Sequence, residues 1–333
     1  MFVGVDHGTV GIRFAGLREK KERKEQEATV FELSRKRAAE LSGEVILSEV
    51  EEGLGLKREE VELVALTYSM GDGFSTIKSI EKVPNRGVRS GEGAGTRIGG
   101  GTKVFDALKD TGVPTILIPG IHRGSEKLDR RMKFFSHGAS PEKVGVAYYI
   151  YKKGFKNFIF SDISSNTVTV AVASGVVVGA VDACLGAPGL FQGPLDLQLL
   201  REIESGRVSA NEAFSNAGVL RKRWVGGVGG GVGKEEEEEL VLDALALFAA
   251  MEISAMQVLM RDCGVGVEAS RVFLTGSVGE REEVKRRIER LLDDGGDGET
   301  ETLTRWSAAV GCAEIAKDVF YGEREILGIE VEL

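Results

Sequence analysis

The sequence predicts an α/β protein made of two domains of similar topology, residues 1–156 and 157–333. The chain has 333 residues, which is long for one domain and sufficient for two. Apolar runs typical of buried strands alternate with longer segments typical of helices. The strand pattern of residues 2–16 also returns at residues 158–172 without a gap, as a duplicated domain would produce.

The first domain is expected to open with strands and to continue with alternating helices and strands. The apolar run at residues 2–6 and the alternating run at 11–17 predict a hairpin around His7-Gly8-Thr9-Val10. Ser140-Pro141-Glu142 predicts a helix start, because serine caps a first turn and proline fits its first position. The other expected elements are a strand at 28–34, a helix at 35–52, a strand at 61–69, a helix at 102–111 and a strand at 113–118.

The second domain restarts this pattern at residue 157. Strands are expected within 157–162, 164–175 and 176–184, followed by a loop-rich region. The expected later elements are a long apolar helix at 238–262, a strand at 272–276, helices at 280–292 and 306–320, and a short terminal strand. We expect each domain to hold a mixed five-stranded sheet with helices.

The repeat places an aspartate at the same point of both halves. Asp6 aligns with Asp162, and each follows an apolar strand and precedes small or hydroxyl residues. Such a turn lets backbone N–H groups and hydroxyls approach phosphate oxygens, and the aspartate can hold Mg²⁺ through water and orient an attacking group. The alternative is that the two aspartates only cap turns. We predict Asp6 and Asp162 as catalytic and metal-binding residues, and as phosphate-binding residues Gly8, Thr9, Arg13, Ser164, Ser165 and Thr167.

Composition disfavours several classes of protein. The net charge of −9 disfavours binding to nucleic acid or to an anionic membrane, and we expect neither partner. We expect no membrane span and no signal peptide, and therefore a cytoplasmic protein. Three cysteines without a CxxC pair are expected to be reduced and buried, and with three histidines they leave too few ligands for a Cys/His metal cluster.

Two glycine-rich segments, 85–101 and 226–235, are expected to be flexible loops. The second imitates a phosphate-binding P-loop, but Val228 stands where the first glycine belongs and Glu235 replaces the Ser or Thr that would bind Mg²⁺. A mobile lid is the alternative function for either loop.

The two aspartate turns resemble the two phosphate motifs of the actin, Hsp70 and sugar-kinase superfamily. Residues 272–279, VFLTGSVG, resemble the third motif of that superfamily, which holds adenosine, and residues 306–320 resemble its closing hinge helix. The resemblance implies two ribonuclease-H-like (actin-like ATPase) domains with a nucleotide cleft between them, and ATP with Mg²⁺ as ligands. It implies adenosine binding by Gly276, Ser277, Val278 and Gly279.

Within this superfamily the chain looks most like the acetate/butyrate-kinase branch. More narrowly, it resembles the methanogenesis marker protein 12 family in the segments VDHGT, PGIHRG, FSHGASPEKVG, FSDISSNTVT and GAPGLFQGPLDL. That resemblance implies a kinase-like ATP-binding fold in archaeal methane metabolism and no known reaction. Carboxylate kinases usually have Asn and Ser or Thr in the first turn, whereas this chain has Asp6-His7-Gly8-Thr9, which argues against a simple acetate or butyrate kinase.

Polar residues elsewhere are candidates for binding a second substrate. His122 and Arg123 follow a buried strand, His137 precedes a helix, and Asp196 lies in a loop like the substrate loop of butyrate-type kinases. The alternatives are ordinary loop residues and, for Asp196, a helix cap. Glu252 lies in an apolar helix, either as a buried carboxylate near the cleft or as a packing or dimer position.

These observations predict a phosphotransferase or ATPase with an unidentified small-molecule acceptor. The alternative is a nucleotide-gated assembly or maturation factor, in which slow ATP hydrolysis switches binding of a protein partner. A third possibility is a scaffold that has lost ATP binding. The apolar helix at 240–260 suggests a homodimer.

Overall fold

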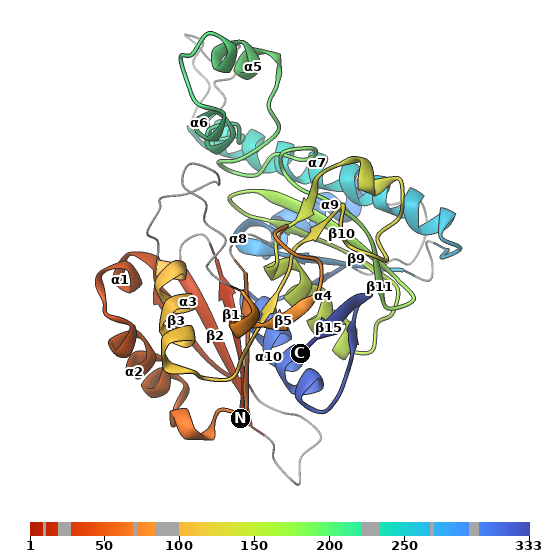
Figure 1. Cartoon of the computed structure of the whole chain (residues 1–333). Coiled ribbons are helices and arrows are strands. Elements are labelled where there is room, and N and C mark those ends of the chain that lie inside the picture. The colour runs from red at the N-terminus through yellow and green to blue at the C-terminus, as the bar shows by residue number, and fades with distance from the viewer. Residues whose placement is uncertain are drawn as a thin grey trace. The chain divides into compact units, whose positions relative to one another are not determined.

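The computed structural model describes residues 1–8, 11–18, 28–68, 72–83, 100–221, 234–266, 270–292 and 300–333. The chain forms two compact units (Figure 1). Unit 1 comprises Met1–Lys156, Gly175–Val177 and Trp306–Leu333, and unit 2 comprises Asn157–Ser174 and Val178–Arg305. The expected second domain, 157–333, differs from unit 2 at its C-terminal end, because the last helix and strands fold onto the sheet of unit 1.

Unit 1 contains an eight-stranded mixed sheet rather than the expected five strands. Its centre is β1 (Phe2–His7), which pairs antiparallel with β2 (Gly11–Leu17) and parallel with β4 (Leu63–Thr67). β3 (Thr29–Ser34) closes one edge, and the strands beyond β4 are, in order, β6 (Thr115–Ile118), β5 (Ile77–Ser79), β15 (Ile329–Glu332) and β14 (Glu325–Ile326). The extra strands come from short segments such as β5 and β14 and from the C-terminal strand β15, which was expected in the second domain.

Helices cover both faces of this sheet, so β1 is apolar along most of its length. Val3 and Val5 face a core that includes α2 (Gly43–Leu54) and α3 (Gly100–Thr111). Gly4 faces the other side, where a methyl group would lie 2.0 Å from the carbonyl oxygen of Ala309 in α10 (Ser307–Phe320). Alternate residues of β1 therefore point to different groups of helices.

The expected helix 35–52 is two helices, α1 (Arg35–Glu40) and α2. The Ser34 side chain accepts a hydrogen bond from Arg37 N–H, and the Ser42 side chain accepts one from Val45 N–H. Each serine therefore starts a helix of its own.

α4 (Glu142–Lys152) crosses α10 at close range. A methyl group on Gly311 would lie 1.8 Å from the carbonyl oxygen of Gly145, so the two backbones touch where both residues lack a side chain. The Tyr148 hydroxyl donates to Asp318 at 2.5 Å, and Lys152 pairs with the same carboxylate at 2.8 Å. These contacts explain why the C-terminal helix belongs to unit 1.

Unit 1 also contains a small two-stranded sheet and three 3₁₀ turns. The sheet is formed by β7 (Ile121–His122) and β8 (His137–Ala139), and the turns are Arg58–Glu60, Ile80–Lys82 and Met132–Phe134.

Unit 2 contains the five-stranded sheet expected for it, in the order β11-β10-β9-β12-β13. β9 (Phe158–Ile163) pairs antiparallel with β10 (Thr167–Ala173) and parallel with β12 (Arg271–Thr275). Phe158 and Phe273 are fully buried and meet edge to face, with ring centroids 6.0 Å apart. The remaining elements are β11 (Val176–Val181), β13 (Thr300–Thr302), α5 (Leu197–Glu204), α6 (Ala210–Ser215), α7 (Lys234–Asp262), α8 (Gly276–Gly279) and α9 (Glu282–Leu292).

α7 corrects the expectation that no segment approaches a membrane span. Among the described residues, one helix, Glu235–Asp262, is long and apolar enough to cross a membrane, with a window of mean hydropathy 1.6 that is 44% buried. The buried residues of α7, among them Leu245, Ala249 and Ile253, belong to the face that packs on β9 and β10. The core of unit 2 therefore explains the apolar residues on this face of α7.

The cysteines were expected to be buried, and this is wrong for two of them. Cys312 is buried, whereas Cys184 and Cys263 are exposed, and none of the three forms a disulfide in the part of the chain that the structure describes. The glycine-rich segments interpreted as loops lie largely at 84–99 and 222–233, outside the described residues.

Candidate functional site

The first turn motif of unit 1 joins β1 to β2. The strand register sets Asp6 opposite Arg13, and the Arg13 Nη1 atom donates to the Asp6 Oδ2 atom at 3.0 Å. Gly8 follows, and a methyl group there would lie 2.8 Å from the Gly11 carbonyl oxygen and 3.0 Å from Arg13 Nη1. The Arg13 guanidinium therefore lies beside both Gly8 and Asp6. The predicted phosphate ligand Thr9 lies outside the described residues.

Asp6 is a buried carboxylate, and its two oxygens differ in their contacts with the described residues. Its residue is 1% exposed, and Oδ1 has no hydrogen-bond partner among the described residues. Burial and then the charge of Glu142 raise the pKa of Asp6 to about 6, against the opposing effects of Arg13 and Lys143. At neutral pH the group is mainly ionised, so Oδ1 can accept a hydrogen bond or a proton from a ligand.

Sequence reasoning missed the charged pair beside Asp6. Glu142 begins α4 and receives hydrogen bonds from the Ser140 hydroxyl and from Lys143 Nζ, the latter at 3.1 Å. Burial opposes ionisation of Glu142, but Lys143 and Ser140 outweigh it and lower the pKa of the carboxyl group. Ser140 was expected to cap the helix, and its hydroxyl instead donates to Glu142. The sequence signal was present, because Ser-Pro-Glu-Lys follows the buried β8, but it was interpreted only as a helix start.

His7 points to the other side of β1 from Asp6, as alternation along a strand requires. Its backbone N–H donates to Thr67 Oγ1 at 3.1 Å, which ties the end of β1 to β4. Burial and then the Arg35 cation lower the pKa of His7 to about 4, so the imidazole is neutral at physiological pH. Both ring nitrogens are shielded from solvent and have no hydrogen-bond partner among the described residues.

The second turn motif lies in unit 2, between β9 and β10. The Ser164 hydroxyl donates to Asp162 Oδ1 at 3.1 Å, and the Ser164 N–H donates to the Asn166 carbonyl at 2.8 Å. Asp162 and Ser165 are half-buried. The predicted residues Asp162, Ser164 and Ser165 thus lie in one turn, in which the Ser164 hydroxyl contacts the Asp162 carboxylate.

A loop at residues 188–193 covers the back of this turn. The backbone N–H of Leu190 donates to the Ser164 carbonyl at 2.9 Å, and that of Phe191 donates to the Ser165 carbonyl at 3.0 Å. Thr167 was predicted to bind phosphate, but it is fully buried and its hydroxyl donates to the Pro188 carbonyl at 2.9 Å. In this structure the Thr167 hydroxyl holds the loop.

The predicted adenosine segment lies directly beside Asp162. Thr275, the last residue of β12, stands opposite Asp162 in the parallel pair. Gly276 has φ +90°, and a methyl group there would lie 2.3 Å from Asp162 Oδ1, so only glycine fits. Ser277 is exposed, whereas Val278 and Gly279 are buried, with Gly279 against Ile163. Unit 2 therefore brings two of the predicted motifs together at the carboxyl ends of adjacent parallel strands.

Three of the four predicted second-substrate residues have contacts within the fold. His122 is buried; its Nδ1 atom accepts from Gly124 N–H at 3.1 Å, and its Nε2 atom lies 3.1 Å from the Phe74 carbonyl. Arg123 is exposed, and His137 is half-buried and pairs with His122 across β7 and β8. Asp196 caps α5, accepting from Gln198 and Leu199 N–H, which is the alternative that the sequence left open.

Glu252 of α7 is a buried carboxylate inside unit 2. It is 8% exposed and accepts hydrogen bonds from Thr169 Oγ1 at 2.6 Å and from Ala187 N–H at 2.5 Å. Burial raises its pKa to about 7, with a smaller contribution from Asp182. The side chain joins α7, β10 and the loop that follows β11.

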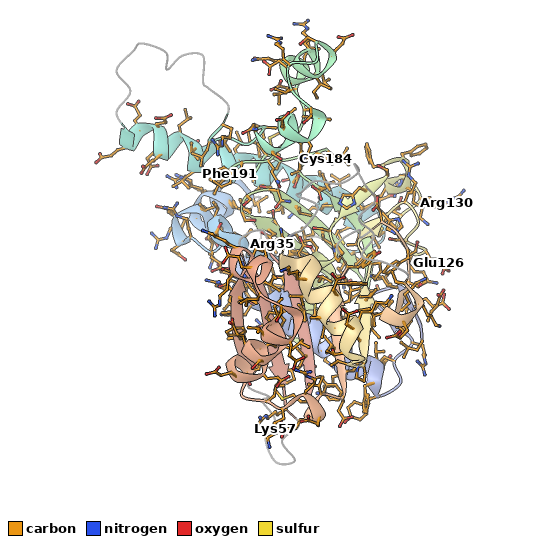
Figure 2. The ribbon with its side chains drawn as sticks, turned by 60° about the vertical axis from the view of Figure 1, so that its left-hand side comes forward. Arg35, Lys57, Glu126, Arg130, Cys184 and Phe191 are labelled. Atoms are coloured by element: carbon orange, nitrogen blue, oxygen red, sulfur yellow. The ribbon has the colours of Figure 1, made fainter. Side chains whose placement is uncertain are left out.

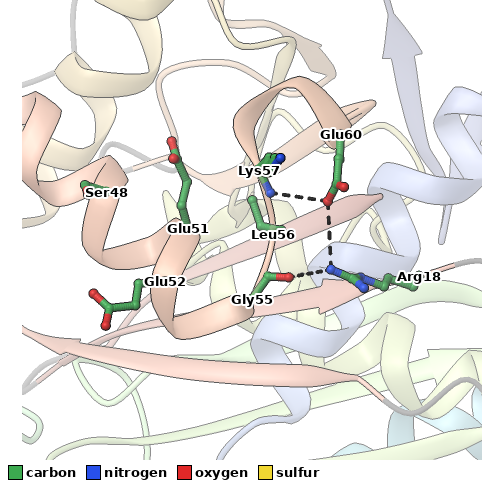
Figure 3. A pocket seen from close by; sticks show the side chains of 8 residues that line it. All are labelled: Arg18, Ser48, Glu51, Glu52, Gly55, Leu56, Lys57 and Glu60. Carbon is green, nitrogen blue, oxygen red and sulfur yellow. Dashed lines mark hydrogen bonds and ion pairs between the residues drawn. The ribbon is translucent and has the colours of Figure 1, made fainter.

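A separate open groove of about 440 Å³ lies at the other end of the unit 1 hairpin (Figure 3). Arg18, which follows β2, donates to the Gly55 carbonyl and pairs with Glu60 at 3.8 Å. Figure 2 shows that Lys57, which lines the groove, lies far from Arg35. Arg35 and His7 both lie next to Gly101. The groove is therefore distinct from the aspartate turn.

The Asp6 carboxylate suits a Mg²⁺ ion whose other ligands are water and phosphate oxygens. Mg²⁺ commonly uses one or two protein carboxylates and completes its shell with water and phosphate oxygens. The free Asp6 Oδ1 provides one such oxygen. Within the described ranges no three His, Cys, Asp or Glu side chains are grouped as a metal site, so a site built entirely of such side chains is not present there.

The fold is similar to that of solved acetate and propionate kinases. Acetate kinase of Porphyromonas gingivalis superposes with a TM-score of 0.57 at 14% identity, covering 95% of this chain and 98% of that one. Propionate kinase of Francisella tularensis gives a TM-score of 0.57 at 11% identity, with coverages of 95% and 98%. At these identities the likeness establishes the fold, and it confirms the predicted fold class.

The chain belongs to the UPF0285 family. The UPF0285 protein of Methanosarcina barkeri is 51% identical over 99% of this chain and 98% of that protein. The UPF0285 protein of Methanocaldococcus jannaschii is 43% identical over 99% of this chain and 98% of that protein. Both organisms are methanogens. No protein-family profile matches the chain.

Proposed function

We propose that this chain binds ATP with Mg²⁺ and transfers or hydrolyses its terminal phosphoryl group. The observation that carries the proposal is the buried Asp6 carboxylate, whose Oδ1 atom has no partner among the described residues although it lies in the first turn motif. A buried, ionisable oxygen without a partner is costly unless a ligand or water uses it. The kinase fold and the repeated turn at Asp162 support the same function.

The proposed roles follow from the contacts of each residue. Asp6 would hold metal-bound water or accept a proton from the attacking group, and Arg13 keeps its carboxylate oriented. Gly8, Thr9, Arg13, Ser164 and Ser165 would cradle phosphates, with Thr167 acting through the covering loop. Gly276 to Gly279 would hold adenosine beside Asp162. Mg²⁺ would neutralise charge on the phosphates when bound.

We place this activity in the cytoplasm of methanogens, with a small-molecule acceptor of unidentified class. His122, Arg123, His137 and Asp196 stay candidates for that acceptor, although His122 and Asp196 have structural contacts of their own. We also propose that the chain is a member of the methanogenesis marker protein 12 family. The methanogen relatives support the proposed setting in methanogens.

A nucleotide-gated assembly factor is the second candidate, and one observation favours it. α7 exposes apolar side chains opposite its buried face, with Met251 58% and Val258 57% exposed. α5 likewise exposes Leu197 and Leu200. Exposed apolar helix faces are typical of protein-binding surfaces, including those of homodimers.

Calorimetric titration with ATP and Mg²⁺ tests the nucleotide proposal. Asp6→Asn and Asp162→Asn keep the side-chain size and remove the charge, so we expect each to weaken binding at least tenfold. Asp196→Asn is the matched control, because asparagine also caps helices, and its affinity should equal that of the parent. Equal affinities in all four proteins would refute the assignment of the aspartates.

Turnover separates the two candidate functions. Phosphoryl transfer to a small acceptor, measured as ADP release that depends on the acceptor, supports the phosphotransferase. Slow ADP release that accelerates only when a protein partner is added supports the assembly factor instead.

A further inference from the structure

A cluster of unpartnered polar atoms lies on the face of β1 opposite Asp6. Three nitrogen atoms are shielded from solvent and have no hydrogen-bond partner among the described residues: His7 Nδ1, His7 Nε2 and Arg35 Nε. Buried nitrogens of this kind are rare in folded proteins, because each loses its water without gaining a partner. Three of them on two neighbouring side chains indicate a place that a ligand or water fills.

Gly101 of α3 marks where the two side chains come together. A methyl group on Gly101 would lie 3.1 Å from His7 Cδ2 and 3.3 Å from Arg35 Nη2. The imidazole and the guanidinium therefore flank one point at the start of α3, and α1 packs against α3 in the same region. Glycine keeps this point open, since any side chain would press on both groups.

The charge of the cluster favours an anion. Arg35 has no carboxylate partner in the described ranges, whereas nearby Arg13 pairs with Asp6 and Glu32. Glu142 also influences His7, but its charge is offset by Lys143 at 3.1 Å. The His7 imidazole carries at least one ring N–H, which can donate to a ligand. A bound oxyanion could receive hydrogen bonds from the Arg35 Nε–H and from the imidazole.

We infer that His7, Arg35 and Gly101 form a subsite for an oxyanion group of the phosphoryl acceptor. The inference rests on the proposed function, which places the transferred phosphoryl group at the turn that follows Asp6. His7 adjoins Asp6 in the chain but faces the opposite side of the strand. An acceptor anchored at Arg35 would therefore lie beside the transfer point while the nucleotide phosphates occupy the side of Asp6 and Arg13.

The oxyanion is a carboxylate or a phosphate, and the experiment distinguishes them. Titration of the full chain with acetate and, separately, with inorganic phosphate is followed by the imidazole ¹H–¹⁵N signals of His7. The chain has three histidines, and loss of one signal in His7→Asn identifies it. We expect one of the two anions to shift the His7 signal with saturation, because an anion bound beside the imidazole changes its chemical environment.

Variants of the cluster decide whether binding depends on it. Arg35→Gln should weaken anion binding about tenfold or more, because it removes a charged hydrogen bond. Arg35→Lys should weaken anion binding less than Arg35→Gln, because lysine keeps the positive charge. Lys36→Gln, which changes the exposed next residue, should bind as the parent does. An anion affinity that is unchanged in Arg35→Gln, or the absence of saturable shifts with both anions, would overturn the subsite.

A nucleotide analogue separates the acceptor from the nucleotide. The same titration is repeated with saturating AMP-PNP and Mg²⁺, and we expect the anion to bind alongside it. Displacement of the anion by AMP-PNP would assign the cluster to the nucleotide phosphates and overturn the acceptor assignment. If AMP-PNP itself does not bind, the proposed function fails, and with it the acceptor assignment, while the anion titrations still decide whether the oxyanion subsite exists.

Discussion

Replacing Glu252 with glutamine should make unit 2 more stable at pH 8 and change little at pH 5. The carboxyl group is 8% exposed, and burial raises its pKa from an ordinary 4.5 to about 7. Between pH 4.5 and pH 7 the Glu252 carboxyl group is ionised in the unfolded chain but still protonated in the folded chain. Stability contributed by this group is therefore present below pH 4.5 and is lost as the pH rises through 7.

The size of the effect follows from the two pKa values. Their difference corresponds to at most about 3 kcal/mol, of which about 2 kcal/mol is lost between pH 5 and pH 8. Glutamine carries no charge, and its carbonyl oxygen can still accept from Ala187 N–H. Its amide can donate to Thr169 Oγ1, which can then donate to Ser161 Oγ 3.0 Å away. We therefore expect Glu252→Gln to gain about 1–2 kcal/mol over the parent at pH 8.

Urea unfolding followed by circular dichroism at the two pH values measures this gain. The informative quantity is the difference between variant and parent, because other groups titrate equally in both. Glu238→Gln, an exposed position on the same helix, is the matched control and should show no pH-dependent difference. A Glu252→Gln difference that stays constant between pH 5 and pH 8 would refute the assignment of a protonated, buried carboxyl group.

Three further predictions concern separate parts of the chain. Gly311→Val should destabilise unit 1 by about 2–4 kcal/mol, since its side chain would enter the contact with Gly145, and thermal unfolding measures the loss. Arg13→Met removes a cation that lowers the pKa of Asp6, so the pKa of Asp6 should rise above 6. The acidic limb of the pH–activity profile should then move to higher pH. A limb that does not move would contradict the pairing of Arg13 with Asp6. Asp196→Ala should cost about 1 kcal/mol of helix stability in α5 and leave ATP affinity unchanged, which hydrogen exchange and calorimetry test together.

Local periodicity predicted most of the elements and the paired turn motifs. Asp6 and Asp162 could be found because each follows a largely apolar run and the two segments align without a gap. The return of α10 to unit 1 could not be found this way, because it depends on a backbone contact between Gly145 and Gly311. Two isolated glycines in separate helices carry no signal of their meeting.

The charged groups around Asp6 were missed for a related reason. Glu142 and Lys143 are adjacent in sequence and look like the ordinary first turn of a helix. Their effect on Asp6 exists only because α4 and β1 belong to the same unit and α10 lies against both. Sequence spacing reports the direction of a side chain within an element, whereas a pKa depends on which elements surround it.

The two repeated turns are not equivalent, and the difference bears on mechanism. In unit 2 the backbone of the turn is covered by residues 188–193, the Asp162 carboxylate receives the Ser164 hydroxyl, and Gly276 packs against it. In unit 1 the Asp6 Oδ1 atom has no partner among the described residues, and burial holds the pKa of the group near 6. A group that must gain or lose a proton needs a free oxygen and a pKa close to the working pH. Asp6 therefore suits proton transfer, whereas Asp162, fixed by its neighbours, suits holding a ligand in place.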